Sequence, residues 1–163
     1  MSHITKILAT TDCSEASVEV MNYAVKIANK NQAEIIVLYV VSSLRSVVSN
    51  VLSKTGEAKV IAAEDQLERF WQSVNKNDMK VELVVKYGDP FSEIISYAEN
   101  HNNDVMVMGT NGRTGLTHVV MGSVAEKVVR YSSIPVIIVK KEPSVIPDYF
   151  SNIDYEYDSQ KLY

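Results

Sequence analysis

The sequence has little cysteine, no long apolar run and no excess of positive charge. Its single cysteine, Cys13, cannot form an internal disulfide or a cysteine-based metal cluster, which is typical of a reducing cytoplasm. The longest strongly apolar run covers residues 35–41, whereas a helix that crosses a bilayer needs about 20 such residues. The first residues show no signal-peptide pattern. We therefore expect a cytoplasmic protein without a membrane partner.

The negative charge is gathered near one end of the chain. The net charge of −4 comes from 16 basic and 20 acidic residues, and residues 142–163 hold five acidic side chains against one lysine. The other residues are neutral as a set, so they offer no basic surface to a phosphate backbone. This distribution argues against nucleic acid as a partner.

The histidines do not indicate a metal centre. His3, His101 and His118 are far apart in the sequence, and none belongs to a pattern such as HExxH. We expect no metal held by side chains, and we assign no catalytic residue.

The sequence does contain a regular alternation of short apolar runs and amphipathic segments. The apolar runs are rich in β-branched residues, which predicts strands covered on both faces, as in a parallel sheet. We expect strands at 4–9, 35–41, 81–85, 104–108 and 135–139, with helices that begin near residues 16, 60, 90 and 123.

This order of elements predicts a single α/β domain. A chain of 163 residues has about the length of one domain. We expect residues 1–141 to form a five-stranded parallel sheet with helices on both faces. Residues 142–163, where Pro143 and Pro147 interrupt all regular pattern, form an acidic tail that contains tyrosines.

Individual residues predict details of the helices. Asp89 followed by Pro90 is typical of a helix N-cap and the first helical residue. Ser123 and Glu126 have the spacing of a capping box at the last helix. Trp71 has the helical spacing of a core residue.

Apolar spacing also predicts the buried faces of the helices. Tyr23 is expected on the inner stripe of the first helix. Val124, Val128 and Val129 are expected on the inner stripe of the last one. Each helix should therefore turn these side chains toward the sheet.

Polar residues follow two of the predicted strands and indicate a binding site. In an open parallel sheet, ligands bind beyond the carboxyl ends of the strands, where the strand order reverses. Thr10, Thr11 and Asp12 follow the first strand, and a glycine-rich connection follows the fourth.

The glycine-rich connection, residues 109–115, has two interpretations. Its glycines let the backbone approach a ligand closely, and Gly122 and Ser123 open a helix whose N–H groups attract anions. Together with Arg113, this arrangement predicts a phosphate site. The alternative is an ordinary surface loop, since the spacing is neither the dinucleotide fingerprint nor a P-loop.

The same segment carries a family resemblance. Gly109-x2-Gly112-x9-Gly122-Ser123 is similar to G-x2-G-x9-G-[S/T], the ATP-binding signature of the universal stress protein family. The first strand, second strand, third-helix entry and last strand of that family resemble residues 6–14, 35–41, 88–90 and 133–139. The resemblance covers about residues 2–141. It implies the strand order 3-2-1-4-5, in which strands one and four meet where the order reverses.

The resemblance also implies roles for individual residues. Asp12 would face the ribose of ATP beside Thr10 and Thr11, and the backbone of Val40 would bind adenine. Met108 and Gly109 would form the floor of the site. The residues that hold the phosphates would be Gly112, Arg113, Gly122, Ser123 and Val124. We expect Mg²⁺ to be bound to the phosphates. From the residues alone, the alternative role of Asp12 and Ser123 is to cap the helices that follow them.

Three functions are therefore considered. The first is a stress-response regulatory protein that binds ATP and forms a homodimer through the apolar edge strand at 135–140. The alternative is a slow ATPase or phosphotransferase. The third is an interaction module that only dimerises, as one branch of the family does.

The tail gives the first testable prediction. We expect Tyr149, Phe150 and Ile153 to pack on the domain or on the dimer mate, because they are too apolar for a purely solubilising segment. The alternative is a solvated tail. Truncation after Lys141 should lower the melting temperature or weaken the dimer. A melting temperature, a dimer mass and a nucleotide affinity that all stay unchanged would contradict docking of the tail.

Overall fold

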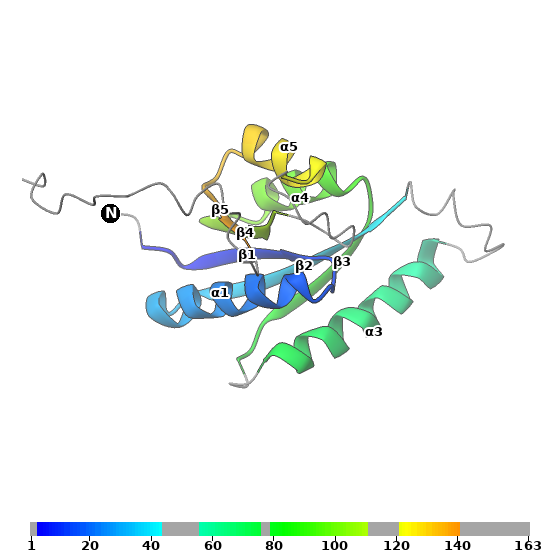
Figure 1. Cartoon of the computed structure of the whole chain (residues 1–163), viewed down its shortest axis with the longest axis horizontal. Coiled ribbons are helices and arrows are strands. Elements are labelled where there is room, and N and C mark those ends of the chain that lie inside the picture. The colour runs from blue at the N-terminus through cyan, green and yellow to red at the C-terminus, as the bar shows by residue number, and fades with distance from the viewer. Residues whose placement is uncertain (1–2, 44–55, 76–78, 111–120, 141–163) are drawn as a thin grey trace, which may run out of the picture.

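Five parallel strands lie at the centre of the computed structural model, in the order β3-β2-β1-β4-β5 (Figure 1). The structure describes residues 3–43, 56–75, 79–110 and 121–140. The strands are β1 (Lys6–Thr11), β2 (Glu34–Ser42), β3 (Glu82–Gly88), β4 (Val105–Gly109) and β5 (Val136–Val139). Both the parallel sheet and its predicted order are confirmed.

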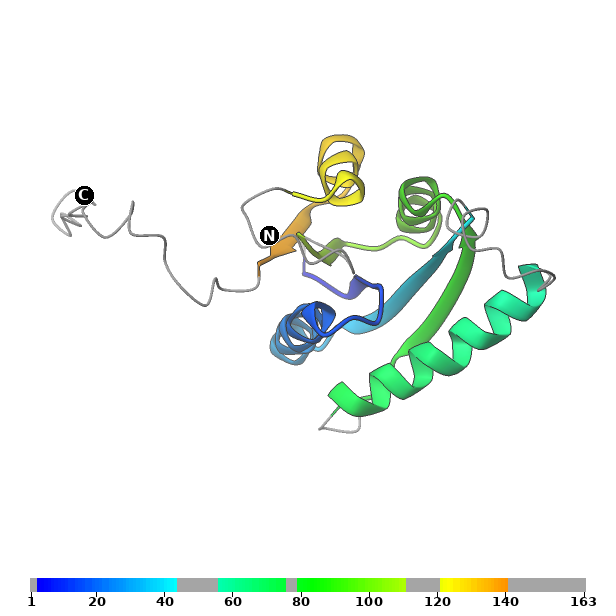
Figure 2. The same cartoon turned by 45° about the vertical axis from the view of Figure 1, so that its right-hand side comes forward.

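Helices cover both faces of this sheet. On one face lie α1 (Ala16–Asn31) and α3 (Gly56–Val74), and on the other lie α4 (Pro90–Asn100) and α5 (Ser123–Tyr131), as Figures 1 and 2 show. Within the described residues, none of the helices is long and apolar enough to cross a membrane.

The two helix layers explain why the strands are apolar without interruption. Along β1, Ile7 and Ala9 belong to the core cluster that includes α1 and α3, whereas Leu8 belongs to the cluster that includes α4 and α5. Successive side chains of a strand point to opposite faces, and here both faces are covered. The sheet therefore buries every side chain of its central strand from Ile7 onward.

Four of the five strands run further toward their carboxyl ends than the apolar runs predict, and β5 ends at Val139 as predicted. β1 continues through Thr10 and Thr11, which pair with Leu38 and Tyr39 of β2. A ladder uses backbone N–H and C=O groups, so polar side chains extend it wherever a neighbouring strand supplies partners. Polar residues consequently lie at the carboxyl edge of the sheet.

Two predicted details of the helices are confirmed. Asp89 is the N-cap of α4, where its Oδ2 accepts a hydrogen bond from Ser92 N at 3.0 Å, and Pro90 is the first helical residue. This hydrogen bond lowers the pKa of Asp89 below its ordinary value. Trp71 is 5% exposed and belongs to the core.

The predicted capping box at the last helix is wrong. Gly122, which has no side chain to cap with, occupies the N-cap of α5, and Ser123 is the first helical residue. The carbonyl of Gly122 accepts from Glu126 N at 2.9 Å, so the helix begins one residue earlier than the box requires. A backbone bond, not a serine side chain, fixes this start.

The predicted inner faces of two helices are wrong in part. Tyr23 and Val129 are 43% and 47% exposed. α5 packs against α4 on one side, and its buried stripe holds only Ala125 and Val128. Apolar spacing alone does not show how much of a helix is covered by its neighbours, and therefore how wide its buried stripe is. The prediction on the tail lies outside the described residues.

Asp104 joins the amino ends of the two central strands. Its Oδ2 accepts from Thr5 N at 2.7 Å, from Thr5 Oγ1 at 2.8 Å and from Lys6 N at 2.9 Å. The bonds from Thr5 and then Lys6 hold the pKa of Asp104 below its ordinary value. One carboxylate therefore ties the start of β1 to the residue that precedes β4.

Replacing Asp104 should make the stability less sensitive to acid. Asp104→Asn keeps the shape but removes the charge, and we expect a loss of about 1 kcal/mol, or roughly 3 °C in Tm, because solvent screens an exposed carboxylate. The folded pKa lies below the unfolded one, so this contribution is complete above about pH 4 and is lost as the pH falls through the folded pKa.

Thermal unfolding of both proteins between pH 7 and about pH 2 tests this. The difference in Tm should shrink toward the acid end. Asp65→Asn is the matched control, because Asp65 makes only an exposed helical pair with Arg69 at 2.7 Å. A constant difference at all pH values would contradict the role assigned to Asp104.

Candidate functional site

The carboxyl end of the sheet opens between β1 and β4. Pairing between these two strands ends at Ala9↔Val107, although β1 continues to Thr11 and β4 to Gly109. On their outer sides, β1 stays paired with β2, and β4 with β5, up to those last residues. The two halves of the sheet therefore part where the strand order reverses, which is the usual place for a ligand in such folds.

A tight turn after β1 holds Asp12 in place. Ser14 N and Ser17 Oγ donate to Asp12 Oδ1 at 3.0 and 2.7 Å. Cys13 has a left-handed φ of 59° and donates its backbone N–H to Thr11 Oγ1 at 2.9 Å. Side chains on both sides of Cys13 thus fix the turn that carries the carboxylate.

The residues predicted beside Asp12 lie at the ends of their strands. Thr10 and Thr11 close β1 and are 8% and 9% exposed, and Val40 is a half-buried residue near the end of β2. The N-cap of α1 is Glu15, so Asp12 does not cap that helix. The carboxylate is held by the turn instead.

The other half of the opening is formed by the end of β4 and the beginning of α5. Met108 and Gly109 are the last residues of β4. Thr110 then donates its N–H to Val139 O at 3.3 Å and accepts from Gly122 N at 2.7 Å. These two backbone bonds tie the start of α5 to β4 and β5.

The first turn of α5 presents backbone N–H groups at this edge. Gly122 has extended backbone (φ −62°, ψ 149°), and Ser123 and Val124 are the first two helical residues. The first N–H groups of a helix have no partner within it and lie at its positive end, where anions bind. Gly112 and Arg113, the other predicted phosphate residues, lie outside the described residues.

Sequence reasoning missed three residues of this site: Ser14, Ser17 and Thr110. The spacing Asp12-x-Ser14 is typical of a turn in which a carboxylate accepts an N–H two residues on, and could have indicated Ser14. Ser17 belongs to the first turn of α1, and only the folded chain brings its hydroxyl to Asp12. Thr110 acts through its backbone, for which the sequence carries no signal.

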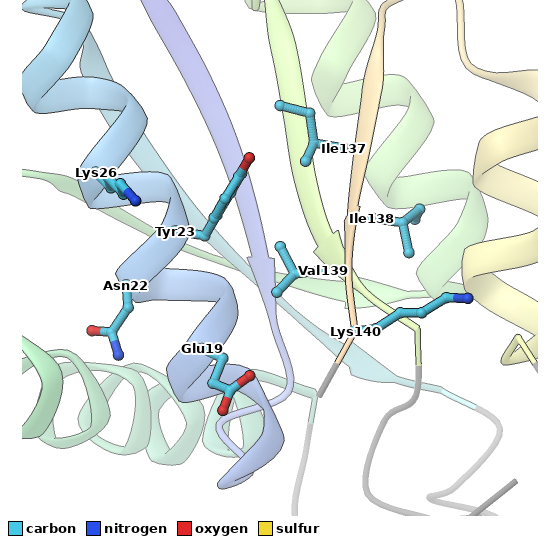
Figure 3. A pocket seen from close by; sticks show the side chains of 8 residues that line it. All are labelled: Glu19, Asn22, Tyr23, Lys26, Ile137, Ile138, Val139 and Lys140. Atoms are coloured by element: carbon cyan, nitrogen blue, oxygen red, sulfur yellow. The ribbon is translucent and has the colours of Figure 1, made fainter. Parts of the chain in front are cut away.

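A hollow of about 660 Å³ lies elsewhere, between α1 and β5 (Figure 3). It is lined by Glu19, Asn22, Tyr23, Lys26, Ile137, Ile138, Val139 and Lys140. Tyr23 points from α1 toward β5, and Ile137 and Val139 point back toward α1. This hollow has an apolar strand edge as one wall, whereas the opening between β1 and β4 is bordered by a held carboxylate after β1 and by a helix N-terminus tied to the end of β4.

Metal ligands are not gathered in the described part of the chain. No group of three or more His, Cys, Asp or Glu side chains is placed there to hold a metal ion.

Comparison with known proteins identifies the family. A family model described as the universal stress protein family matches residues 3–140, which span all of the described strands and helices. The chain belongs to the universal stress protein family. The family predicted from the sequence is thus confirmed, and the match stops before the tail.

Curated universal stress proteins match most of this chain. Universal stress protein MJ0531 of Methanocaldococcus jannaschii is 32% identical over 146 residues, which cover 83% of this chain and 82% of that protein. Universal stress protein MJ0577 of the same organism is 28% identical over 156 residues, which cover 85% and 96%.

Solved structures match the fold of this universal stress protein as well. The structure of MJ0577 has a TM-score of 0.75 at 27% identity, covering 88% of this chain and 100% of that one. Universal stress protein UspA from Lactobacillus plantarum has a TM-score of 0.69 at 29% identity, covering 85% and 99%. The predicted α/β domain with sheet order 3-2-1-4-5 is therefore shared with known members.

Proposed function

We propose that this universal stress protein binds ATP, with Mg²⁺ on the phosphates, in the opening between β1 and β4, and acts as a regulatory protein in a stress response. The observation that carries the proposal is that Asp12 follows the end of β1, and the N-terminus of α5 is tied to the end of β4, where the pairing of these two strands has ended. A carboxylate suits the hydroxyl groups of ribose, and helix N–H groups suit phosphate.

Each predicted residue has a place in the proposed complex. Asp12, Thr10 and Thr11 lie beside the ribose, and the backbone of Val40 contacts adenine. The floor consists of Met108 and Gly109. The phosphates contact Gly112, Arg113, Gly122, Ser123 and Val124. Mg²⁺, when bound, would neutralise phosphate charge.

Relatives of the same fold support adenine nucleotides as the ligand class. One solved universal stress protein is described in complex with cAMP, with a TM-score of 0.55 and 21% identity. Another, from Archaeoglobus fulgidus, is described in complex with dAMP, with a TM-score of 0.61 and 20% identity. At these identities the likeness concerns the fold alone, and the choice of ATP rests on the similarity of Gly109-x2-Gly112-x9-Gly122-Ser123 to the ATP-binding signature of the family.

The regulatory part of the proposal rests on a short physical connection. Thr110 accepts from Gly122 N at the proposed phosphate end and donates to Val139 O of the edge strand β5. A group bound at the start of α5 is thus two hydrogen bonds away from the edge of the sheet. Through this connection, an occupied site could alter a partner surface.

Two further parts of the proposal need their own measurements. Slow hydrolysis of ATP, or phosphate transfer, is the alternative function, and release of ADP from ATP by the purified protein would favour it. A cytoplasmic location is proposed from the single thiol, Cys13.

A carboxylate at position 122 should remove phosphate binding without unfolding the domain. Gly122 is an N-cap with extended backbone, and Asp is among the best N-cap residues, so Gly122→Asp suits the fold. Its carboxylate would take the N–H groups of the first turn and repel phosphate. We expect ATP to bind at least about tenfold more weakly by calorimetry, or roughly 1.4 kcal/mol.

Gly122→Asn is the matched control, because it has the same shape and caps a helix equally well but carries no charge. It should weaken ATP binding less than Gly122→Asp does. If both folded variants bind ATP as tightly as the wild type, the phosphate assignment is wrong.

We propose further that the protein is a homodimer through β5. This edge strand reads Val136-Ile137-Ile138-Val139, whereas the opposite edge strand, β3, carries Glu82 and Lys86. Charged residues on an edge oppose strand pairing, and an apolar edge invites it. The hollow beside β5 adds the exposed ring of Tyr23 to this apolar surface (Figure 3).

Tyr23→Lys tests the dimer more cleanly than a change within β5. Ile138 packs against a core cluster, so Ile138→Lys also affects folding, whereas Tyr23 is 43% exposed. The wild type should show twice the chain mass of 18.2 kDa by light scattering at micromolar concentration, and Tyr23→Lys should shift it toward the monomer.

Tyr131→Lys is the matched control, because Tyr131 is 62% exposed on α5 and does not line the hollow. It should leave the mass unchanged. A wild type of monomer mass would exclude the homodimer.

A further inference from the structure

Ser17 contacts Asp12 in two ways although it lies on another element. It is in the first turn of α1 and is 7% exposed. Its hydroxyl donates to Asp12 Oδ1 at 2.7 Å and accepts from Asp12 N at 3.4 Å. One buried hydroxyl therefore contacts both the side chain and the backbone of Asp12.

A second donor acts on the same carboxylate oxygen. Ser14 N donates to Asp12 Oδ1 at 3.0 Å. Two donors from different directions select one orientation of the carboxylate among those that an aspartate side chain adopts. The other oxygen, Oδ2, is shielded from solvent. Away from water, each hydrogen bond that the carboxylate makes is electrostatically stronger.

Orientation matters for the ligand contact that Asp12 is proposed to make. The strength of a hydrogen bond falls steeply as its angle departs from linearity. A hydrogen bond from a ribose hydroxyl contributes more binding free energy when the carboxylate already has a fixed orientation. A carboxylate that rotates freely must first lose conformational entropy, which weakens binding.

We propose that Ser17 is a positioning residue, whose hydroxyl orients the Asp12 carboxylate and thereby sets a preference of the site for ribonucleotides over deoxynucleotides. This inference rests on the proposed nucleotide binding and names the part of the ligand that is discriminated. Ser17 acts through Asp12 and does not itself contact the nucleotide.

The experiment compares three nucleotides in calorimetry: ATP, 2′-deoxy-ATP and 3′-deoxy-ATP. The wild type should bind ATP at least about tenfold more tightly than the weaker of the two analogues, because a hydrogen bond to a charged acceptor is lost. In Ser17→Ala, this ratio should fall to about threefold or less. A merely structural role would weaken all three nucleotides equally and leave the ratio unchanged.

Two more variants control for folding and location. Ser73→Ala removes an exposed helical hydroxyl on α3, which donates to Phe70 O at 2.7 Å, so it should retain the ratio of the wild type. Ser17→Cys keeps the approximate shape with a weak donor. It should lower the ratio as Ser17→Ala does, and it provides the test if Ser17→Ala does not fold by circular dichroism.

The outcomes separate this inference from the proposed function. A wild type that binds none of the three nucleotides overturns the proposed function. A wild type that binds ATP without a ribose preference overturns the inference alone, as does a folded Ser17→Ala or Ser17→Cys that keeps the full ratio. An equal fall in Ser73→Ala would show that the effect does not depend on the contact with Asp12 and would also overturn the role of Ser17.

Discussion

The end of the β1–β4 ladder at Ala9↔Val107 is the constraint on which the rest of this universal stress protein depends. The chain first builds the sheet outward from β1 in one direction, and then crosses to the other side of β1 for β4 and β5. The helix after β1 lies on one face and the helix after β4 on the other (Figure 2). Two polar chain segments therefore border the same opening from opposite faces, which is how a reversal of strand order produces a ligand site.

The same pair of strands is held together at its other end. Asp104 accepts three hydrogen bonds from Thr5 and Lys6 at the amino ends, so β1 and β4 are joined there by a side chain as well as by the ladder. The two strands are thus joined at their amino ends and separate at their carboxyl ends.

One strained backbone conformation lies in the turn that follows β1. Three described non-glycine residues have positive φ: Cys13, Gln32 and Asn102. Gln32 is the C-cap of α1, a common place for this conformation, and asparagine adopts it readily. Cys13 has neither reason. Its conformation costs on the order of 1 kcal/mol. It persists because Cys13 N donates to Thr11 Oγ1 and Ser14 N donates to Asp12 Oδ1, and these bonds hold the turn.

The sequence by itself determined the fold class, the sequence of strands and helices, and those details that depend on neighbouring residues. These details are predicted by runs of β-branched residues, by helical spacing and by the pair Asp89–Pro90. Each of these patterns depends only on residues that are close in the sequence. The family resemblance supplied the strand order. Only the tertiary structure decided where the β1–β4 ladder ends, that Gly122 and not Ser123 is the N-cap of α5, and that Tyr23 and Val129 remain exposed. It also decided that the Ser17 hydroxyl meets Asp12. Each of these features depends on which elements lie side by side and how closely they pack. The free energy of such contacts comes from residues that are brought together by the folded chain, so a local sequence pattern does not reveal it.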